Sequence, residues 1–174
     1  MASPIKFAHV VLRTARFEEM LRWWTSVLEA GVRFGNDFIA FLSYDDEHHR
    51  VAMVNMPGLP DPEAGRAGVE HFAYTYETPD VLFDTYRRLK ADGIHPYWTI
   101  HHGATLSAYY RDPDGNQVEL QIDTMSLSEA DDFMRSPVFA ANPIGIDVDL
   151  DELIGRYEAG DPSVLAYPAG AGAE

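Results

Sequence analysis

Three side chains suited to binding a divalent metal stand out in the sequence: His9, His71 and Glu119. Each histidine opens a short apolar segment that is typical of a strand. Glu119 lies between Val118 and Leu120 on a third such segment, so its carboxylate faces away from theirs. Two neutral imidazoles and one carboxylate form the facial arrangement of non-haem Fe(II) sites, which leaves coordination positions open. We therefore predict an Fe(II) site, with Mn(II) as the alternative, because both metals suit these ligands.

Taken one at a time, these residues have simpler interpretations. A lone histidine is more often an ordinary half-buried side chain than a ligand, and Glu119 alone could face solvent on an open sheet. An internal repeat favours the metal site. If the chain is duplicated, equivalent inward positions of the two halves converge on one point, and His9 and His71 are equivalent.

The repeat is visible in the helices that follow each histidine, which we predict at residues 17–29 and 79–92. Gly31 and Gly93 each stand 22 residues after their histidine, where a left-handed glycine would close a helix. The apolar positions of the helices superpose: Met20 on Leu82, Leu21 on Phe83 and Trp24 on Tyr86. Chance similarity of two β-α units is the alternative, and the equal spacing favours duplication.

Strand-like segments follow each glycine, at residues 38–44 and 50–55 in the first half and at 97–100, 106–111 and 117–122 in the second. The predicted fold is α+β, with two βαβββ modules that form one half-closed mixed β-barrel around a metal, plus a C-terminal helical extension. The predicted boundaries are a 1–124 domain (module one 5–56, linker 57–68, module two 69–124), the helical extension 125–160 and a flexible tail 161–174.

The repeat also indicates an open side of the site. Aligning Tyr44 with Tyr110, with one residue of gap in the turn, places Ala52 opposite Glu119. No carboxylate or histidine stands on the predicted strand 50–55, so no fourth ligand comes from there. A chelating substrate would require such an opening.

Composition excludes several classes of partner and site. The formal net charge of -15 argues against nucleic acid and membrane as partners, because nucleic acids and many membrane surfaces are themselves negatively charged. The absence of cysteine excludes disulfides and thiolate zinc sites. The sequence contains no apolar run near 18 residues, and its first residues lack the pattern of a secretory signal, so we expect a cytoplasmic protein.

The duplicated unit, together with Arg-Asp-Pro-Asp-Gly-Asn-Gln-Val-Glu-Leu at residues 111–120, resembles the vicinal oxygen chelate superfamily over roughly residues 5 to 124. That superfamily includes glyoxalase I, fosfomycin- and bleomycin-resistance proteins, methylmalonyl-CoA epimerase and type I extradiol ring-cleaving dioxygenases. Three features resemble the extradiol branch. They are the paired histidines of residues 46–52, the run His101-His102-Gly103 and Tyr109, ten residues before Glu119.

The resemblance implies roles for these residues. His49 would be an acid/base group beside the metal, whereas two surface histidines at positions 48 and 49 are the alternative. Tyr109 would hydrogen-bond a substrate hydroxyl. Either His101 or His102 would be a further active-site residue, because the stretch before Tyr109 is one residue shorter than the family pattern. Many extradiol dioxygenases have two such domains, one catalytic and one vestigial, whereas the pattern of residues predicts one here.

The function implied is an extradiol dioxygenase that cleaves a catechol-type ring with O2, its substrate a small aromatic diol. Phe38, Phe41 and Trp98 are substrate-pocket candidates, with core packing as the alternative. The rival functions are a metal-dependent isomerase or transferase of the glyoxalase or fosfomycin-resistance type, and a metal-free drug-binding protein. Glyoxalase-like members usually have four protein ligands, which disfavours them, whereas fosfomycin-type enzymes use three, so the ligand count leaves that rival open. By resemblance alone, we expect a homodimer or a higher homo-oligomer.

Overall fold

The structure, a computed structural model, describes residues 2–63, 65 and 67–168. The chain divides into two compact units. Unit 1 comprises Met1–Gly68 and Asp112–Asn116, and unit 2 comprises Val69–Arg111 and Gln117–Glu174.

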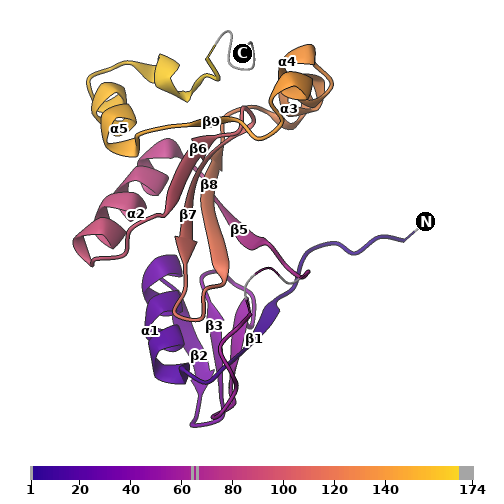
Figure 1. Cartoon of the computed structure of the whole chain (residues 1–174), viewed down its shortest axis with the longest axis vertical. Helices are drawn as coiled ribbons and strands as arrows, with labels where there is room; N and C mark the ends of the chain where they lie inside the picture. Colours follow the sequence, from indigo (N-terminus) through magenta and orange to yellow (C-terminus); the bar gives the residue numbers. More distant parts are fainter. Residues whose placement is uncertain (1, 64, 66, 169–174) are drawn as a thin grey trace. The chain divides into compact units, whose positions relative to one another are not determined.

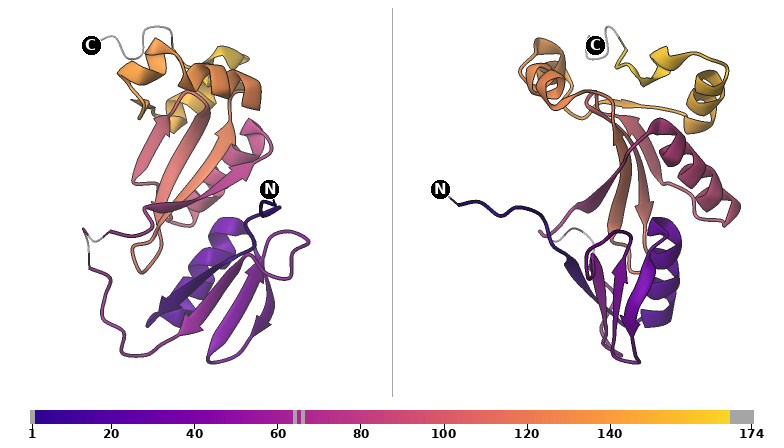
Figure 2. Two further views of the ribbon diagram at one scale, coloured as in Figure 1. Left: turned by 90° about the vertical axis from the view of Figure 1, so that its right-hand side faces the viewer. Right: turned by 180° about the vertical axis from the view of Figure 1, so that it is seen from behind.

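Unit 1 is a four-stranded sheet with one helix on one face (Figures 1 and 2). Its elements are β1 (Val10–Thr14), α1 (Phe17–Leu28), β2 (Gly31–Gly35), β3 (Ile39–Ser43) and β4 (Val51–Asn55). The strand order is β1-β4-β3-β2, with β1 parallel to β4 and the other neighbours antiparallel. Met20, Trp24 and Val27 of α1 are fully buried, and each such side chain contributes about 1.5–3 kcal/mol through burial.

Unit 2 repeats this topology. Its elements are β5 (His71–Tyr76), α2 (Pro79–Ala91), β6 (Trp98–His101), β7 (Thr105–Arg111) and β8 (Gln117–Asp123). The order is β5-β8-β7-β6, with β5 parallel to β8, and β9 (Ile146–Asp147) adds a fifth strand beside β6. The side chain of Thr78 caps α2 by accepting from the Val81 N–H. Leu82, Phe83 and Leu89 of α2 are buried.

The C-terminal part of unit 2 lies across the end of its sheet where β6 turns into β7 (Figure 1). It consists of α3 (Leu127–Met134), α4 (Pro137–Ala141), β9, α5 (Leu150–Glu158) and a 3₁₀ helix (Pro162–Leu165). Ser126 and Glu129 form a capping box at the start of α3. Lys90 and Tyr86 of α2 both bond Asp151, which anchors α5 on α2. Residues 169–174 of the predicted tail lie outside the described residues.

Strand register confirms the duplication and the position of Ala52. Val11 on β1, two residues after His9, pairs with Ala52. Ala73 on β5, two residues after His71, pairs with Glu119. Ala52 is therefore the counterpart of Glu119. The alignment of Tyr44 with Tyr110 was wrong, however. Tyr110 pairs with Val118 as Leu42 pairs with Val51, so the counterpart of Tyr110 is Leu42.

The α+β fold with two similar modules is as predicted, and several local features differ. Glu29, with φ 48°, takes the left-handed position that ends α1, whereas Gly31 begins β2. Gly93 does take a left-handed conformation, with φ 78°. β2 was not predicted because its residues are all exposed, so it has no alternation of apolar and polar positions. Among the described residues, no helix is both long and apolar enough to span a membrane.

Candidate active site

One face of the unit 2 sheet carries His71 and Glu119 on neighbouring parallel strands. Nε2 of His71 lies 3.0 Å from Oε2 of Glu119. Glu119 is only 4% exposed, and a carboxylate so deeply buried requires a cation, a metal or hydrogen-bond donors. Two donor atoms that each lie about 2.1 Å from one metal ion at a right angle are about 3.0 Å apart. The pair thus has the spacing of adjacent ligands, and it also suits an imidazole–carboxylate hydrogen bond.

Tyr109 lies beside this pair, directly across from Glu119 on β7. Its hydroxyl is 3.0 Å from Nε2 of His102, and the same nitrogen is 3.8 Å from Oε1 of Glu119. Burial, followed by the negative charge of Glu119, raises the pKa of Tyr109. The side chain is therefore a neutral phenol at physiological pH, able both to donate and to accept one hydrogen bond.

The adjacent histidines after β6 have different surroundings. His102 lies at Tyr109, and its Nδ1 contacts the carbonyl oxygen of Ile144. His101 pairs with Leu106 and Ile146, away from that face, and is 1% exposed. Its Nε2 donates to the Leu165 carbonyl at 3.0 Å, and its Nδ1 accepts from the Gly103 N–H at 3.0 Å. Burial lowers the pKa of His101, which stays neutral.

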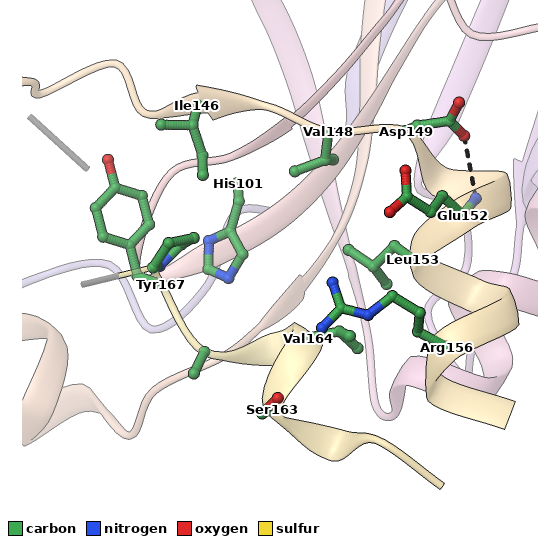
Figure 3. Close-up of a pocket in the computed structure, with 12 residues that line it drawn as sticks. His101, Ile146, Val148, Asp149, Glu152, Leu153, Arg156, Ser163, Val164 and Tyr167 are labelled. Carbon is green, nitrogen blue, oxygen red and sulfur yellow. Dashed lines mark hydrogen bonds between the residues drawn. The ribbon is translucent and has the colours of Figure 1, made fainter. Parts of the chain in front are cut away.

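His101 also lines a cavity of about 590 Å³ between β9, α5 and the 3₁₀ helix (Figure 3). Leu153, Val164 and Tyr167 line the same cavity. The ring of His101 thus packs beneath the C-terminal segments, whereas the ring of His102 lies with Tyr109 and Glu119.

Trp98 lies on the Tyr109 side of the sheet. Its ring stacks on that of Tyr109, with centroids 4.9 Å apart and an interplanar angle of 28°. Its indole N–H donates to Asp147 at 2.7 Å. Tyr97, which the sequence did not single out, also lies near, with its ring centroid 6.3 Å from that of Tyr109. Two aromatic side chains, Trp98 and Tyr97, therefore lie near the ring of Tyr109.

In unit 1, the ring of His49 lies between those of His9 and Phe41. The centroid distances are 4.3 Å to His9 and 4.7 Å to Phe41, with Phe41 stacked. Nδ1 of His49 is 2.6 Å from Nδ1 of His48. Burial, then the neighbouring imidazoles of His9 and His48, lowers the pKa of His49. His49 is thus uncharged near neutral pH and can accept a proton.

Arg50 supports this histidine group, and sequence reasoning missed it. Its guanidinium donates to the carbonyls of Phe7 and Ala8 at 2.8 and 3.1 Å, and it forms an ion pair with Asp45 at 2.8 Å. These bonds hold the segment before β1, from which His9 projects. Phe38 lies just before β3 and is 61% exposed.

Each unit thus gathers part of the predicted site. Unit 2 brings together His71, Glu119, Tyr109, His102 and Trp98, and unit 1 brings together His9, His48, His49 and Phe41. Among the described residues, no group of three or more histidine or acidic side chains is arranged so that it could hold a metal ion. Of the three predicted ligands, His9 belongs to unit 1, and His71 and Glu119 belong to unit 2.

Residues 6–120 match the family model described as the Glyoxalase/Bleomycin resistance protein/Dioxygenase superfamily. The chain belongs to this family, the vicinal oxygen chelate superfamily of the sequence resemblance. Two Rhodococcus globerulus proteins are similar over nearly the whole chain. Biphenyl-2,3-diol 1,2-dioxygenase 2 is 45% identical over 93% of this chain and 86% of its own length. Biphenyl-2,3-diol 1,2-dioxygenase 3 is 41% identical over 90% of this chain and 84% of its own length.

Solved structures show the same fold at much lower identity. A lactoylglutathione lyase from Agrobacterium tumefaciens is 18% identical, with a TM-score of 0.54 over 70% of this chain and 96% of its own. A glyoxalase/bleomycin resistance protein/dioxygenase domain from Frankia sp. EAN1pec is 21% identical, with a TM-score of 0.56 over 70% of this chain and 99% of its own. At this identity the likeness concerns the fold alone.

Proposed function

We propose that this chain is an extradiol dioxygenase that uses O2 to cleave a catechol-type ring beside its two hydroxyls. The observation that carries the proposal is the identity of 45% and 41% to two biphenyl-2,3-diol 1,2-dioxygenases, which spans at least 90% of the chain. That span includes the C-terminal extension beyond the family match at residue 120. Biphenyl-2,3-diol is accordingly the first substrate to test.

His9, His71 and Glu119 are the proposed metal ligands, and the donor set fits the group. The 3.0 Å spacing of His71 and Glu119 suits adjacent ligands, and Glu119 is buried as a ligand carboxylate would be. Ala52, the counterpart of Glu119, has no donor atom, so the first module contributes no second carboxylate. When bound, Fe(II) or Mn(II) would supply a Lewis acid for both diol oxygens and an open position for O2.

His49 is the proposed general base for a substrate hydroxyl. Its lowered pKa leaves the imidazole uncharged near neutral pH, so it is in the form that can take a proton from a hydroxyl. Stacking on Phe41 holds the ring in one orientation. His48, which contacts His49 through Nδ1, takes no substrate proton in this proposal.

Tyr109 and His102 orient the bound diol. The phenol of Tyr109 is neutral, and its position beside Glu119 sets it next to the proposed metal. His102 Nε2 bonds the phenol and holds its direction. Trp98 stacks against the Tyr109 ring and excludes water from that side, and Phe41 contributes a second aromatic surface. Phe38, exposed before β3, remains a candidate for contact with the outer part of the substrate.

An anaerobic sample loaded with Fe(II) and mixed with biphenyl-2,3-diol and simpler catechols in air tests the function. We expect oxygen uptake equal to the substrate consumed, together with a coloured ring-opened product. Neither signal for any diol, from protein that retains one equivalent of metal, would exclude the dioxygenase function for that panel. Protein purified anaerobically without stoichiometric metal would instead indicate a metal-free binding protein.

The role of His49 is tested with His48 as its matched control. His49→Ala should lower kcat about 100-fold, the usual range for a general base, and leave metal content unchanged. His48→Ala should change kcat less than about threefold, a difference of under about 0.7 kcal/mol in the barrier. Equal losses of metal and turnover in His49→Ala would show that it acts as a ligand rather than as a base.

A further inference from the structure

The C-terminal extension closes against the turn that carries His102. Gly103 follows His102 with φ 95°, and a Cβ there would lie 2.2 Å from the Phe133 ring of α3. Gly145 has φ 111°, and a Cβ there would lie 2.3 Å from the carbonyl oxygen of His101. Thr124 donates to the Gly103 carbonyl at 2.6 Å. A side chain at Gly145 would meet backbone and displace the turn, whereas a side chain at Gly103 would displace the ring of Phe133.

The side chain of Asn142 shapes the turn that reaches His102. Its Nδ2 donates to the Gly145 carbonyl at 2.6 Å, and its Oδ1 accepts from the Gly145 N–H at 3.0 Å. Pro143 limits the backbone between them. The turn therefore presents the carbonyl of Ile144 in one direction, and that oxygen contacts His102 Nδ1.

Strand β9 fixes the position of this turn along the sheet. Ile100 and His101 pair with Asp147 and Ile146, and the Val148 N–H donates to the Thr99 carbonyl at 3.1 Å. Trp98 donates to Asp147 at 2.7 Å. Because β9 directly follows Gly145, the register of β9 on β6 determines where the Ile144 carbonyl meets the imidazole.

The contact determines which nitrogen of His102 carries the hydrogen. A carbonyl oxygen only accepts, so Nδ1 must donate. In the neutral imidazole, Nε2 is then an acceptor, and it faces the Tyr109 hydroxyl at 3.0 Å. Glu119, the other polar neighbour of Tyr109, is also an acceptor when ionised. Because both of these neighbours are acceptors, the Tyr109 hydroxyl donates its one proton to His102 or to Glu119. The Tyr109 oxygen is then left to accept a hydrogen bond from a bound substrate.

We propose that the Asn142–Gly145 turn is the positioning device for His102. Its Ile144 carbonyl holds the imidazole in the Nδ1–H tautomer and thereby makes Tyr109 a hydrogen-bond acceptor toward the substrate hydroxyl. The role of Tyr109 toward a diol rests on the proposed function, whereas the tautomer of His102 does not. Asn142, Ile144 and Gly145 are positioning residues, since they act through His102.

Gly145→Ala tests the proposal, with Gly160→Ala as the matched control. Both glycines lie in the extension with positive φ, 111° and 91°, but a Cβ at Gly160 meets no atom within 4 Å. Long-range proton–nitrogen spectra of full-length protein loaded with diamagnetic Zn²⁺ would report the tautomer. The signals of His102 are assigned by their loss in His102→Gln. We expect the Nδ1–H tautomer in the wild type and in Gly160→Ala, and a mixture in Gly145→Ala.

Kinetics provide the second measurement. In Gly145→Ala, kcat with biphenyl-2,3-diol should fall about 10- to 100-fold at unchanged metal content, as for loss of a supporting hydrogen bond. Gly160→Ala should stay within about threefold of the wild type, or about 0.7 kcal/mol. If Gly145→Ala does not fold, Asn142→Ala should give the same tautomer mixture. Asn142→Asp keeps the acceptor for the Gly145 N–H and should therefore give a smaller change in tautomer.

The outcomes separate this proposal from the proposed function. An Nε2–H tautomer in the wild type, or identical spectra and kcat in Gly145→Ala and Gly160→Ala, would overturn the positioning role. A tautomer change in Gly145→Ala from a protein that cleaves no diol would support the positioning role and overturn only the dioxygenase function.

Discussion

The two sheets share strand order and register but carry different chemistry at equivalent positions. On β3 and β4 of unit 1, Phe41 pairs with Ala52. On β7 and β8 of unit 2, Tyr109 pairs with Glu119. The two units therefore share the backbone arrangement and differ in the side chains of one cross-strand pair. The pair is apolar in unit 1 and consists of a phenol and a carboxylate in unit 2. The polar pair contains Glu119, a proposed ligand, and the apolar pair contains no side chain that could bind a metal.

The units also hold their histidines by different means. In unit 1, the charged guanidinium of Arg50 ties down the backbone before His9 and pairs with Asp45. In unit 2, neutral backbone carbonyls of the C-terminal extension bond His101 and His102. A charged support depends on pH, and a carbonyl does not. We therefore expect the histidine supports of the two units to respond differently to substitution and to acid.

The largest effect is expected from removing the carboxylate that distinguishes the two sheets. Glu119→Gln should lower metal content severely and kcat/KM on the order of 1000-fold, about 4 kcal/mol of transition-state stabilisation, because a neutral amide is a poorer ligand. Metal analysis and oxygen-uptake rates measure both. The control is Gln121→Ala on the same strand, where the lost partner is Thr75. Full metal retention in Glu119→Gln would refute its assignment as a ligand.

A smaller effect is expected from making the β7 residue resemble its counterpart on β3. Tyr109→Phe removes only the hydroxyl, so metal content should persist while kcat falls about 10- to 100-fold, or about 1.4–2.8 kcal/mol. The reciprocal Phe41→Tyr should change kcat by less than about fivefold, roughly 1 kcal/mol. Steady-state kinetics with one diol compare the two. An unchanged kcat in Tyr109→Phe would remove Tyr109 from the substrate site.

The turns that join the last two strands of each module differ, and we expect a substitution in the second turn to lower the stability of the fold. The 45–50 turn carries His48 and His49, whereas the Asp112–Asn116 turn carries a buried carboxylate. Asp112 accepts from Trp24 at 3.0 Å and from the Asn116 backbone and side chain at 2.8 Å each. Asp112→Ala should destabilise the fold by about 2–3 kcal/mol, because buried donors lose a charged acceptor. Denaturant unfolding measures it, with the exposed Asp84→Ala as control. A change below about 0.5 kcal/mol would contradict the account.

The smallest effect is expected from acid, which protonates Asp45 and weakens its ion pair with Arg50 in unit 1. Arg50 lowers the pKa of Asp45 to about 2, below the value of about 3.9 in an unfolded chain. This depressed pKa contributes stability that is present above about pH 4 and is lost as the pH falls toward 2. Carbon NMR of the Asp45 carboxyl should give a midpoint near 2 in the wild type and a higher one in Arg50→Gln. Equal midpoints in the two proteins would show that Arg50 is not the cause.

Sequence periodicity predicted α1, α2 and all but two of the described strands, because the apolar stripe of each of these helices faces one sheet. It missed β2, whose residues are exposed, and β9, whose two residues are too few for any pattern. It also assigned the end of α1 to Gly31, although Glu29 adopts the left-handed conformation there. A single strained residue is stabilised by the packing around it, and periodicity does not report packing.

The sequence by itself determined the family, the duplicated topology, and the candidates His9, His71 and Glu119, because repeats and strand alternation are local properties of the chain. Only the tertiary structure shows that His102, and not His101, lies beside Tyr109. The two are adjacent, and which one meets Tyr109 depends on a sheet register and on a carbonyl 42 residues away at Ile144. Contacts that close over such a separation are made by folding and leave no pattern in neighbouring residues.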